Sequence, residues 1–507
     1  MKAAAFAVMQ NGTSLPLTRA PVVPIAGFRQ LVTGAVRDGA EIASLFAAPG
    51  SRRDLLLVAV LSDPHTGVMR VAASLVETSW PALTPECEAA HLFEREIAEQ
   101  YNLQPKGHPW LKPVKYQPPM PGAAPGAQPA SGQRAAIGSG PFFRVEGEEV
   151  HEVAVGPVHA GVIEPGHFRF QCHGEEVLHL EISLGYQHRG VENLMSGGPD
   201  KRSIHLAETL AGDTTIGHAT AYCELLEALG GTQAPPRAQA IRAIALELER
   251  AANHVGDLGA LAGDVGFLPT ASWCGRVRGD VLNLTALVCG NRFGRGLVRP
   301  GGVGFDLDEK REGMLADQVK TAARDALGAI DLLWKTPSVL ARFEGTGVVV
   351  NATARAIGLT GPAARASGVD RDVRRDHPSG MWRFAHIPVS TWRTGDVFAR
   401  AYVRALELQR SFAFIQEQLA TLPSGDAMAP LRPPAGGAFA LTLAEGWRGA
   451  ICHAAMTDRR GKFSRYKVVD PSFRNWFGLA LAMRGQQVSD FPLCNKSFNL
   501  SYCGHDL

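Results

Sequence analysis

Residues 151–195 read HEVAVGPVHAGVIEPGHFRFQCHGEEVLHLEISLGYQHRGVENLM, and this stretch decides the fold of the chain. Short apolar runs lie between Gly- and Pro-containing turns, which predicts a β-rich, loop-rich segment. Histidine recurs six times, and the last one, His188, opens the sequence His-Arg-Gly that leads to Glu192. Imidazole and carboxyl groups can hold and pass protons near neutral pH. The stretch therefore predicts a site that handles protons or a polar ligand.

Length, charge and hydropathy bound the class of protein. A chain of 507 residues is too long for one ordinary core, so two or three domains are expected. The net charge of +2 is too small to predict a nucleic-acid partner. No stretch is apolar enough for long enough to span a bilayer. The N-terminal MKAAAFAVMQNG predicts a first β-strand rather than a signal peptide, because no small-residue cleavage region follows. These features predict a cytoplasmic protein.

The cysteines are scattered along the chain, and no two of them have C-x-x-C spacing. This pattern suits neither a disulfide framework nor a zinc knuckle. We expect most of them to be reduced thiols that serve as small core residues. They are Cys87, Cys172, Cys223, Cys274, Cys289, Cys452, Cys494 and Cys503.

Composition divides the chain into three parts. Residues 1–116 contain two strand-like runs, from Leu55 and from Gly67, and then an acidic helix that begins near Pro85, which together predict a small α+β domain. Residues 117–140 are rich in Pro, Gly and Ala and almost free of large apolar side chains, so they predict a linker. Residues 141–507 form a large domain.

Long helical patterns fill the middle of the large domain, and three of them are long and apolar enough to predict a central bundle. A β-hairpin is expected around Arg459-Arg460-Gly461 near the end of the chain. The fold class is therefore α+β, with a helical bundle and peripheral β-hairpins. The expected helices begin at Lys201 and Pro236, and cover 276–292, 309–333 and 396–419.

Short motifs follow one another through the large domain: Gly156-Pro157-Val158-His159, Glu164-Pro165-Gly166-His167-Phe168-Arg169, His188-Arg189-Gly190-Val191-Glu192, Glu247-Leu248-Glu249-Arg250 with His254, Gly301-Gly302-Val303, Arg365-Ala366-Ser367-Gly368, Asp376-His377-Pro378, Val403-Arg404 and Val488-Ser489-Asp490. From His151 onward the chain resembles the superfamily that unites the D-type subunits of complex I with the large subunits of nickel–iron (NiFe) hydrogenases. Within it, the resemblance is greatest to the large subunits of formate hydrogenlyase and membrane-bound hydrogenases. Each motif alone is weak, but their order through the domain is specific.

The first domain carries a matching resemblance. Phe93-Glu94-Arg95-Glu96, Glu99, Tyr101 and Gly107-His108-Pro109 are similar to the C-type subunits of complex I and to the N-terminal part of formate hydrogenlyase large subunits. That family usually has Asp where Glu99 stands and Gly where Asn102 stands. The resemblance implies fused C-like and D-like modules. Without it, the charges at 94–96 are more typical of a solvated helix face.

The resemblance also shows which residues are missing. A NiFe site needs four cysteine thiolates, and soft thiolates are what such a metal pair requires. At those positions the chain has Ala211, Thr214, Ser501 and Gly504. Cys503 stands one residue before the last of them, and one displaced thiol with a serine cannot replace four thiolates. The resemblance therefore implies no NiFe centre and no metal or cofactor bound directly.

The quinone ligands of the D-type subunits are absent as well. The positions that correspond to their headgroup histidine and tyrosine are Ile163 and Gly212. A standard quinone site is therefore not expected, although a quinone remains one candidate acceptor.

Glu192 is the first candidate for chemistry, because the matching glutamate of hydrogenases relays protons. A carboxyl group buried beside a cavity has a raised pKa that suits this role. The alternative is a structural ion pair with Arg189, about one helical turn earlier. His188 and His218 are expected to flank the same cavity and to bind a quinone oxygen or pass a proton; the alternative is that both are hydrogen-bonded core histidines.

Three further residues match positions of interest in the family. His159 begins the former cofactor-facing loop and either supports a small ligand or caps a turn. Arg365 matches a family arginine near the cavity, and its permanent charge suits a carboxylate partner. Asp506 is expected to anchor the C-terminal tail, where His505 and Cys503 are too few for a metal site.

Two functions follow from the resemblance. In the first, the chain is the large subunit of a complex I-like (NADH dehydrogenase-like) or formate-hydrogenlyase-like oxidoreductase, peripheral to the cytoplasmic membrane. Its partners would be a small B-type subunit like that of complex I, which carries a 4Fe-4S cluster, and antiporter-like membrane subunits. Electrons would pass from the cluster to a quinone or another acceptor, coupled to proton movement. In the second, the chain is a non-catalytic scaffold and coupling subunit. An active hydrogenase is the third and weakest hypothesis.

Overall fold

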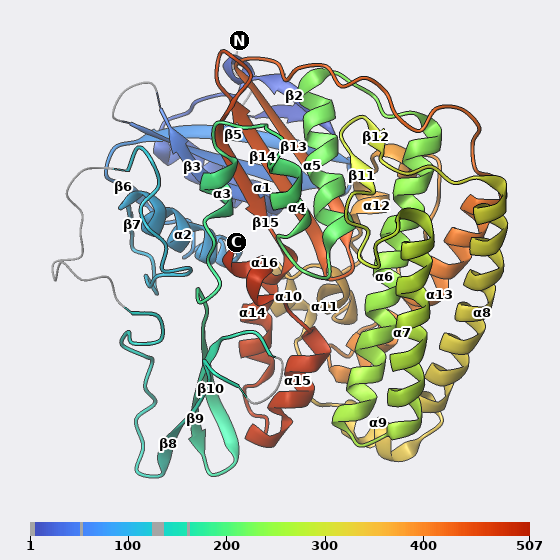
Figure 1. The fold of residues 1–507 in the computed structure, drawn as a ribbon. Coiled ribbons are helices and arrows are strands. Elements are labelled where there is room, and N and C mark those ends of the chain that lie inside the picture. Colours follow the sequence, from blue (N-terminus) through green and yellow to red (C-terminus); the bar gives the residue numbers. More distant parts are fainter. Residues whose placement is uncertain (1–5, 51–53, 124–135, 160–162) are drawn as a thin grey trace.

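A four-stranded antiparallel sheet forms the first part of the chain in the computed structural model, which describes residues 6–50, 54–123, 136–159 and 163–507 (Figure 1). Its strand order is β1-β5-β4-β3, with α1 (Ile25–Arg37) packed on it. β3 and β4 are buried along almost their whole length, so both faces of the sheet must be covered. The strands are β1 (Ala7–Met9), β3 (Glu41–Pro49), β4 (Leu55–Asp63) and β5 (Val68–Val76).

The acidic helix of the first part, α2 (His91–Tyr101), is not a solvated face. Glu94 is fully buried and accepts hydrogen bonds from the indole of Trp80 (2.7 Å) and from the backbone N–H groups of Leu83 and Thr84 (2.8 and 3.0 Å). Glu96 is also fully buried. The solvated-face interpretation was therefore wrong, because these carboxylates satisfy buried donors. Beside α2 lies a short parallel pair, β6 (Ser79–Pro81) and β7 (Gln104–Lys106).

The stretch quoted first forms a three-stranded antiparallel sheet, as its turns predicted. Its order is β10-β9-β8, and its strands are β8 (Val150–Val155), β9 (His167–His173) and β10 (Glu176–Ser183). A short helix, α3 (Val191–Met195), follows and places Glu192 in its first turn.

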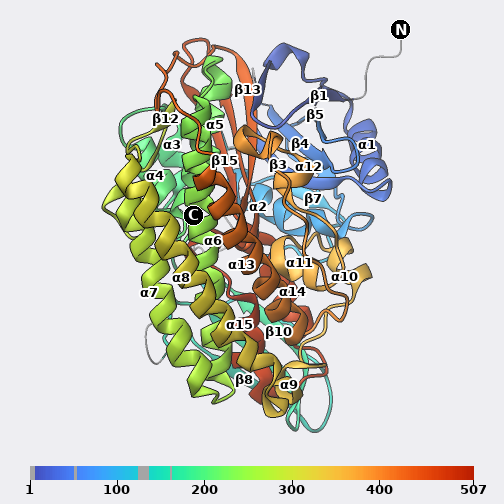
Figure 2. The ribbon, with the colours of Figure 1, turned by 90° about the vertical axis from the view of Figure 1, so that its right-hand side faces the viewer.

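The helical bundle is confirmed and has four long members, which Figure 2 shows side by side. They are α6 (Pro236–Asp264), α7 (Leu268–Cys289), α8 (Glu309–Trp334) and α13 (Val397–Ala420). α7 begins earlier than expected, because Pro269 fits a first helical turn. The helix expected from Lys201 is broken into α4 (Ser203–Glu208) and α5 (Thr215–Gly230). Between them, the carbonyl groups of Thr209 and Leu210 accept from the guanidinium of Arg189 instead of continuing a helix.

A second four-stranded sheet joins the two ends of the chain. Its order is β15-β14-β13-β2, so β2 (Thr13–Pro16) from the first part pairs with β13 (Ala438–Gly446). The expected hairpin is β14 (Gly449–Thr457) with β15 (Phe463–Val469). Phe439, Leu441 and Leu443 of β13 pack into the hydrophobic core of the first part. The two parts therefore share a sheet and a core.

Short elements complete the large domain, and the α+β class is confirmed. Residues 124–135 of the predicted linker lie outside the described residues, and the division into separate domains stays a prediction. Within the described ranges, no helix has the length and apolar character needed to cross a bilayer. The short elements are β11 (Val298–Arg299), β12 (Gly302–Val303), α9 (Pro337–Phe343), α10 (Asn351–Ala356), α11 (Gly361–Ala366), α12 (Val373–Asp376), α14 (Pro471–Ala482), α15 (Phe491–Phe498) and α16 (Tyr502–Asp506).

Candidate functional site

Glu192 is buried and paired with cations. Its Oε1 lies 2.8 Å from Nζ of Lys467 and 3.1 Å from the backbone nitrogen of Val468, and its Oε2 lies 3.0 Å from Nη1 of Arg465. Burial by itself would raise the pKa of this carboxyl, but Lys467, Arg465 and Lys115 hold the pKa well below its ordinary value. The expected raised pKa is therefore wrong, and Glu192 is an anion near neutral pH.

The first part of the chain completes this ion-pair cluster. Nζ of Lys467 also lies 2.6 Å from Oε2 of Glu96, whose Oε1 lies 2.7 Å from Nζ of Lys115. The cluster therefore holds two carboxylates, Glu96 and Glu192, and three cations, and it joins α2 and α3 to β15. Glu192 does form buried ion pairs, as the structural alternative predicted, but its partner is not Arg189. The guanidinium of Arg189 instead donates to the carbonyl oxygens of Thr209 (2.6 Å) and Leu210 (2.9 Å).

The C-terminal tail binds the loop before α3. Oδ1 and Oδ2 of Asp506 accept from the backbone nitrogens of Gly185 and Gln187 (2.8 and 2.9 Å). Nδ1 of His188 lies 2.8 Å from the carbonyl oxygen of Asp506, and burial lowers the pKa of this histidine. Nε2 of His159 lies 3.0 Å from the carbonyl oxygen of Gly166. Asp506 thus anchors the tail in the way the sequence suggested.

His218 lies in a hydrogen-bonded chain of four buried side chains. Its Nε2 is 3.0 Å from Oδ2 of Asp470, and its Nδ1 is 3.0 Å from Nε2 of His453. Nδ1 of His453 is 2.7 Å from the hydroxyl of Tyr466. Burial holds the pKa of His453 well below its ordinary value, so this ring is neutral. Both ring nitrogens of His218 are thus hydrogen-bonded to other side chains of the protein. This arrangement matches the hypothesis of a hydrogen-bonded core histidine rather than that of a histidine facing a cavity.

The positions of the missing cysteines are filled by other groups. The hydroxyl of Thr214 accepts from the indole of Trp447 (3.2 Å), and Ser501 caps α16 by accepting from the backbone nitrogen of Gly504 (2.9 Å). A Cβ atom on Gly504 would lie 2.7 Å from Cγ of Asp470, so a side chain at this position has no room. Together with Ala211, these residues do not fit a NiFe group. Throughout the described ranges, no cluster of three or more His, Cys, Asp or Glu side chains could hold a metal ion.

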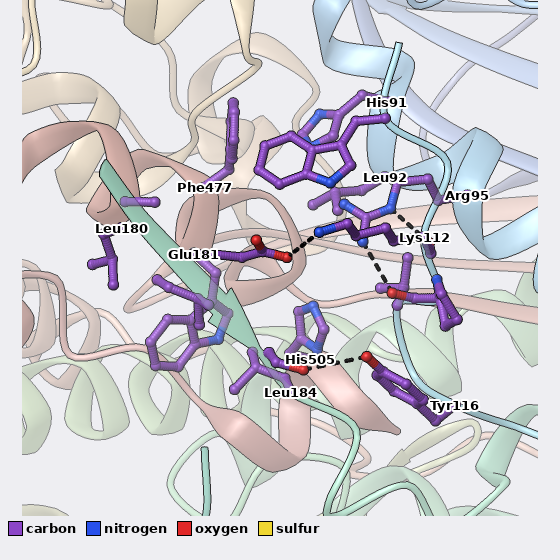
Figure 3. Close-up of a pocket in the computed structure, with 17 residues that line it drawn as sticks. His91, Leu92, Arg95, Lys112, Tyr116, Leu180, Glu181, Leu184, Phe477 and His505 are labelled. Atoms are coloured by element: carbon purple, nitrogen blue, oxygen red, sulfur yellow. Dashed lines mark hydrogen bonds and ion pairs between the residues drawn. The ribbon is translucent and has the colours of Figure 1, made fainter. Parts of the chain in front are cut away.

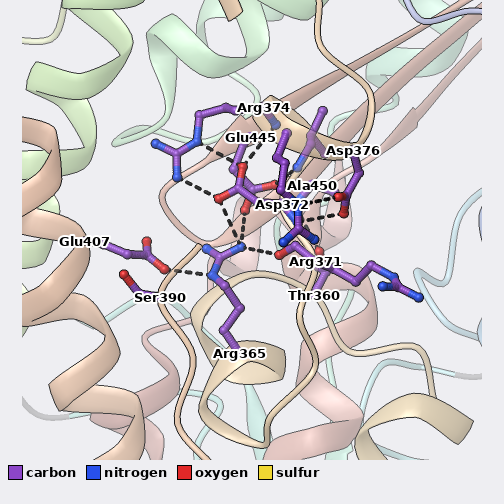
Figure 4. Close-up of polar contacts among 12 residues, drawn as sticks. Thr360, Arg365, Arg371, Asp372, Arg374, Asp376, Ser390, Glu407, Glu445 and Ala450 are labelled. Atoms are coloured by element: carbon purple, nitrogen blue, oxygen red, sulfur yellow. Dashed lines mark hydrogen bonds and ion pairs between the residues drawn. The ribbon is translucent and has the colours of Figure 1, made fainter. Parts of the chain in front are cut away.

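Arg365 belongs to a larger network of buried charges (Figure 4). Its Nε lies 2.7 Å from Oε1 of Glu407, and its Nη1 lies 2.8 Å from Oε1 of Glu445. The expected carboxylate partners of Arg365 are therefore present in the structure, but the sequence did not reveal which residues they are. A single carboxylate in the otherwise apolar strand AFALTLAEG was the signal that could have found Glu445.

A cavity of about 80 Å³ lies between the first part and the large domain (Figure 3). Its walls come from α2, the segment after it, β10, α14 and α16. Nζ of Lys112 lies 2.7 Å from Oε1 of Glu181 in one wall, and burial lowers the pKa of His91 to about 3. His505 of the tail also faces this cavity. None of the residues predicted to form a cavity lines it, so sequence reasoning missed this space entirely.

Known proteins are similar to this chain over much of its length. The family model for the 49 kDa subunit of respiratory-chain NADH dehydrogenase matches residues 264–434. The carbon monoxide-induced hydrogenase of Rhodospirillum rubrum is 33% identical over 353 residues, which cover 69% of this chain and 97% of that protein. Formate hydrogenlyase subunit 5 of Escherichia coli (strain K12) is 32% identical over 446 residues, 86% of this chain and 78% of that protein. The D-type subunit of the NADH-quinone oxidoreductase of Clostridium beijerinckii is 30% identical over 325 residues, 63% of this chain and 87% of that protein.

Proposed function

Because this chain belongs to the family of hydrogenase large subunits and complex I 49 kDa subunits, and is thus a subunit of an oxidoreductase complex, we propose that it serves electron transfer without a NiFe centre. Electrons would come from a 4Fe-4S cluster in a neighbouring B-type subunit like that of complex I and pass to a quinone or another acceptor. The observation that carries this proposal is the filling of the nickel-ligand positions, above all the carboxylate of Asp470 packed against Gly504.

Proton movement would accompany electron transfer, and the chain through His218 is the best candidate to hold the proton. His218 stands between Asp470 and His453 at 3.0 Å from each, so a shift of protons along the chain needs no movement of a heavy atom. Asp470 at one end lies beside Gly504, one of the positions that the resemblance assigns to the nickel ligands. Glu192 is assigned a positioning role instead, because its two oxygens are held by cations and by the backbone of β15.

The proposed complex sits at the cytoplasmic side of a membrane. One relative is named as the alpha subunit of a membrane-bound hydrogenase, from Pyrococcus furiosus, with 29% identity over 367 residues. Because no described helix could cross a bilayer, attachment would depend on antiporter-like membrane subunits. Co-purification of these subunits and the iron–sulfur subunit with a tagged copy of this chain tests the assignment; recovery of the chain alone would contradict it.

A scaffold without catalysis is the second candidate, and it is favoured because both nitrogens of His218 and both carboxylate oxygens of Glu192 are paired with protein groups. The test compares quinone reduction by complexes that carry His218→Gln or, as a matched control on the surface, His151→Gln. The electron-transfer proposal predicts a loss of activity only for His218→Gln, with the complex still assembled. Equal activity of both variants would favour the scaffold.

A further inference from the structure

The network around Arg365 has more carboxylates than guanidinium groups. Each of its members is at most 6% exposed. Arg365 bridges Glu407 and Glu445, and Glu407 also binds Nη2 of Arg250 at 2.6 Å. Arg374 lies 2.7 Å from Glu247 and 2.6 Å from Asp372. An uncompensated charge in such a place is costly, so a fourth positive charge or a proton is required. The carboxylates are Glu247, Asp372, Glu407 and Glu445, and the guanidinium groups are those of Arg250, Arg365 and Arg374.

In the described part of the chain, no cation outside the network is bonded to the carboxylate of Glu445, and Arg410, which lies near Glu407, donates to the hydroxyl of Ser390 (2.6 Å). Arg371 is occupied by Glu41, at 3.2 Å, and Arg375 by Asp376 and Asp370, at 2.7 and 2.6 Å. Two further groups approach the network. Nε2 of His254 lies 3.2 Å from Glu407, but burial lowers the pKa of His254 to about 4, so the ring is neutral at pH 7. Arg474 donates to the carbonyl oxygen of Ala43 (2.8 Å).

Three of the four carboxylates accept two or more side-chain hydrogen bonds each. Glu407 accepts from two guanidinium groups, and although burial opposes it, they hold its pKa well below the ordinary value. Asp372 accepts the fork of Arg374 at 2.9 and 2.6 Å, which outweighs burial and lowers its pKa to about 2. Glu247 accepts from Arg374 and from the hydroxyl of Ser411 (2.5 Å). Glu445 has only one guanidinium contact, with Arg365, and one backbone donor, Val373 (3.0 Å).

Two members of the network, Glu445 and Asp372, reach an opening between the two parts of the chain, and of these Glu445 has the fewer guanidinium contacts. It lines a cavity of about 40 Å³ beside Asp372, with the first part supplying one wall and α12, β13 and α14 the others. Burial and the neighbouring Asp372 raise the pKa of Glu445. The other charged or titratable groups that line this cavity are Glu41, Arg371, Asp376, His377, Cys452 and Arg474.

We propose that Glu445 is the proton-binding carboxyl of this network and exchanges its proton with solvent through the cavity between the two parts. The proton from water bonds to one oxygen of Glu445 and leaves the network neutral; its release leaves one net negative charge next to Arg365 and Glu407. This inference rests on the proton movement of the proposed function and names a second place, apart from His218, where a proton is stored.

The test is infrared spectroscopy of the full chain at neutral pH in H₂O and D₂O, for the wild type and for Glu445→Gln. We expect a carbonyl band of a protonated carboxyl group that shifts in D₂O and is lost in Glu445→Gln. A surface control, Glu344→Gln, should keep the band. Glu445→Gln should also unfold at the wild-type denaturant midpoint, because glutamine imitates the neutral acid, whereas Glu407→Gln should unfold much earlier.

The proposal is overturned if Glu445→Gln keeps the whole band, or if it unfolds as early as Glu407→Gln or fails to fold. These results do not depend on electron transfer. A complex that reduces no quinone but has lost the band in Glu445→Gln would refute the proposed function and leave the proton site standing.

Discussion

Replacement of Glu192 by glutamine should weaken the fold rather than interrupt a proton path. The substitution removes one of two carboxylates from a cluster with three cations, Lys115, Arg465 and Lys467, so the buried net charge rises from +1 to +2. The new amide N–H₂ would also face other donors, because Arg465 and Gln100 both direct N–H groups at Oε2. Loss of one partner of a buried ion pair costs about 3–5 kcal/mol, and we expect a cost within this range.

The assay is urea unfolding of the full chain, followed by circular dichroism, with Glu344→Gln as the exposed control. The pH dependence adds a second readout. Because the pKa of Glu192 in the folded protein lies below its ordinary value of 4.5, its stabilising effect is complete above that value and is lost as the pH falls toward the folded pKa. The difference between wild type and Glu192→Gln should therefore be full at pH 7 and shrink below about pH 4.5.

The reasoning on Glu192 would be refuted by a variant that is as stable as the control. If such a variant also lost proton-coupled activity in the assembled complex, Glu192 would be a proton carrier after all. A stable variant with unchanged activity would show that Glu192 neither stabilises the fold nor carries a proton.

Three other changes test the remaining contacts. Asp470→Asn should lower the free energy of unfolding by about 3 kcal/mol at pH 7, since it removes the anion beside His218. Because the pKa of Asp470 is lowered in the folded protein, this difference from the wild type should shrink below pH 3.8. A difference that does not depend on pH would contradict the pairing. Gly504→Cys should cost about 1–3 kcal/mol by overpacking against Asp470, measured by thermal unfolding. The same change made in an Asp470→Ala chain should cost less relative to that single variant, and an equal cost would contradict the close approach of the two residues. A chain limited to residues 141–507 leaves β13 without β2 and Lys467 without Glu96, so its soluble yield should fall sharply; a folded, soluble fragment would show that the two parts do not depend on each other.

The elements with strong periodicity could be predicted from the sequence, and the polar contacts between distant segments could not. The apolar stripe of α6 and the caps of α8 are local signals, and both helices run nearly as expected. The break between α4 and α5 depends on Arg189, whose hydrogen bonds replace helical ones. No local sequence pattern predicts that Arg189 takes the place of these helical hydrogen-bond donors.

The sequence analysis singled out individual polar side chains but could not predict how they pair. Glu192 and Lys467 are 275 positions apart, so only the folded chain reveals that they meet. The same holds for Arg365 and Glu445, and for His218 and Asp470. That the positions which the resemblance assigns to nickel ligands hold no cysteine depends on residue type alone, so it was predictable without the fold. That Asp470 fills the space beside Gly504 required the structure.

The function proposed for this protein is electron transfer without a NiFe centre. The decisive measurement is metal analysis of the purified complex, combined with quinone-reduction and hydrogen-evolution assays on the same sample. We expect iron from the neighbouring subunit, no nickel, electron transfer to an acceptor and no hydrogen evolution. One nickel per chain together with hydrogen evolution would contradict it.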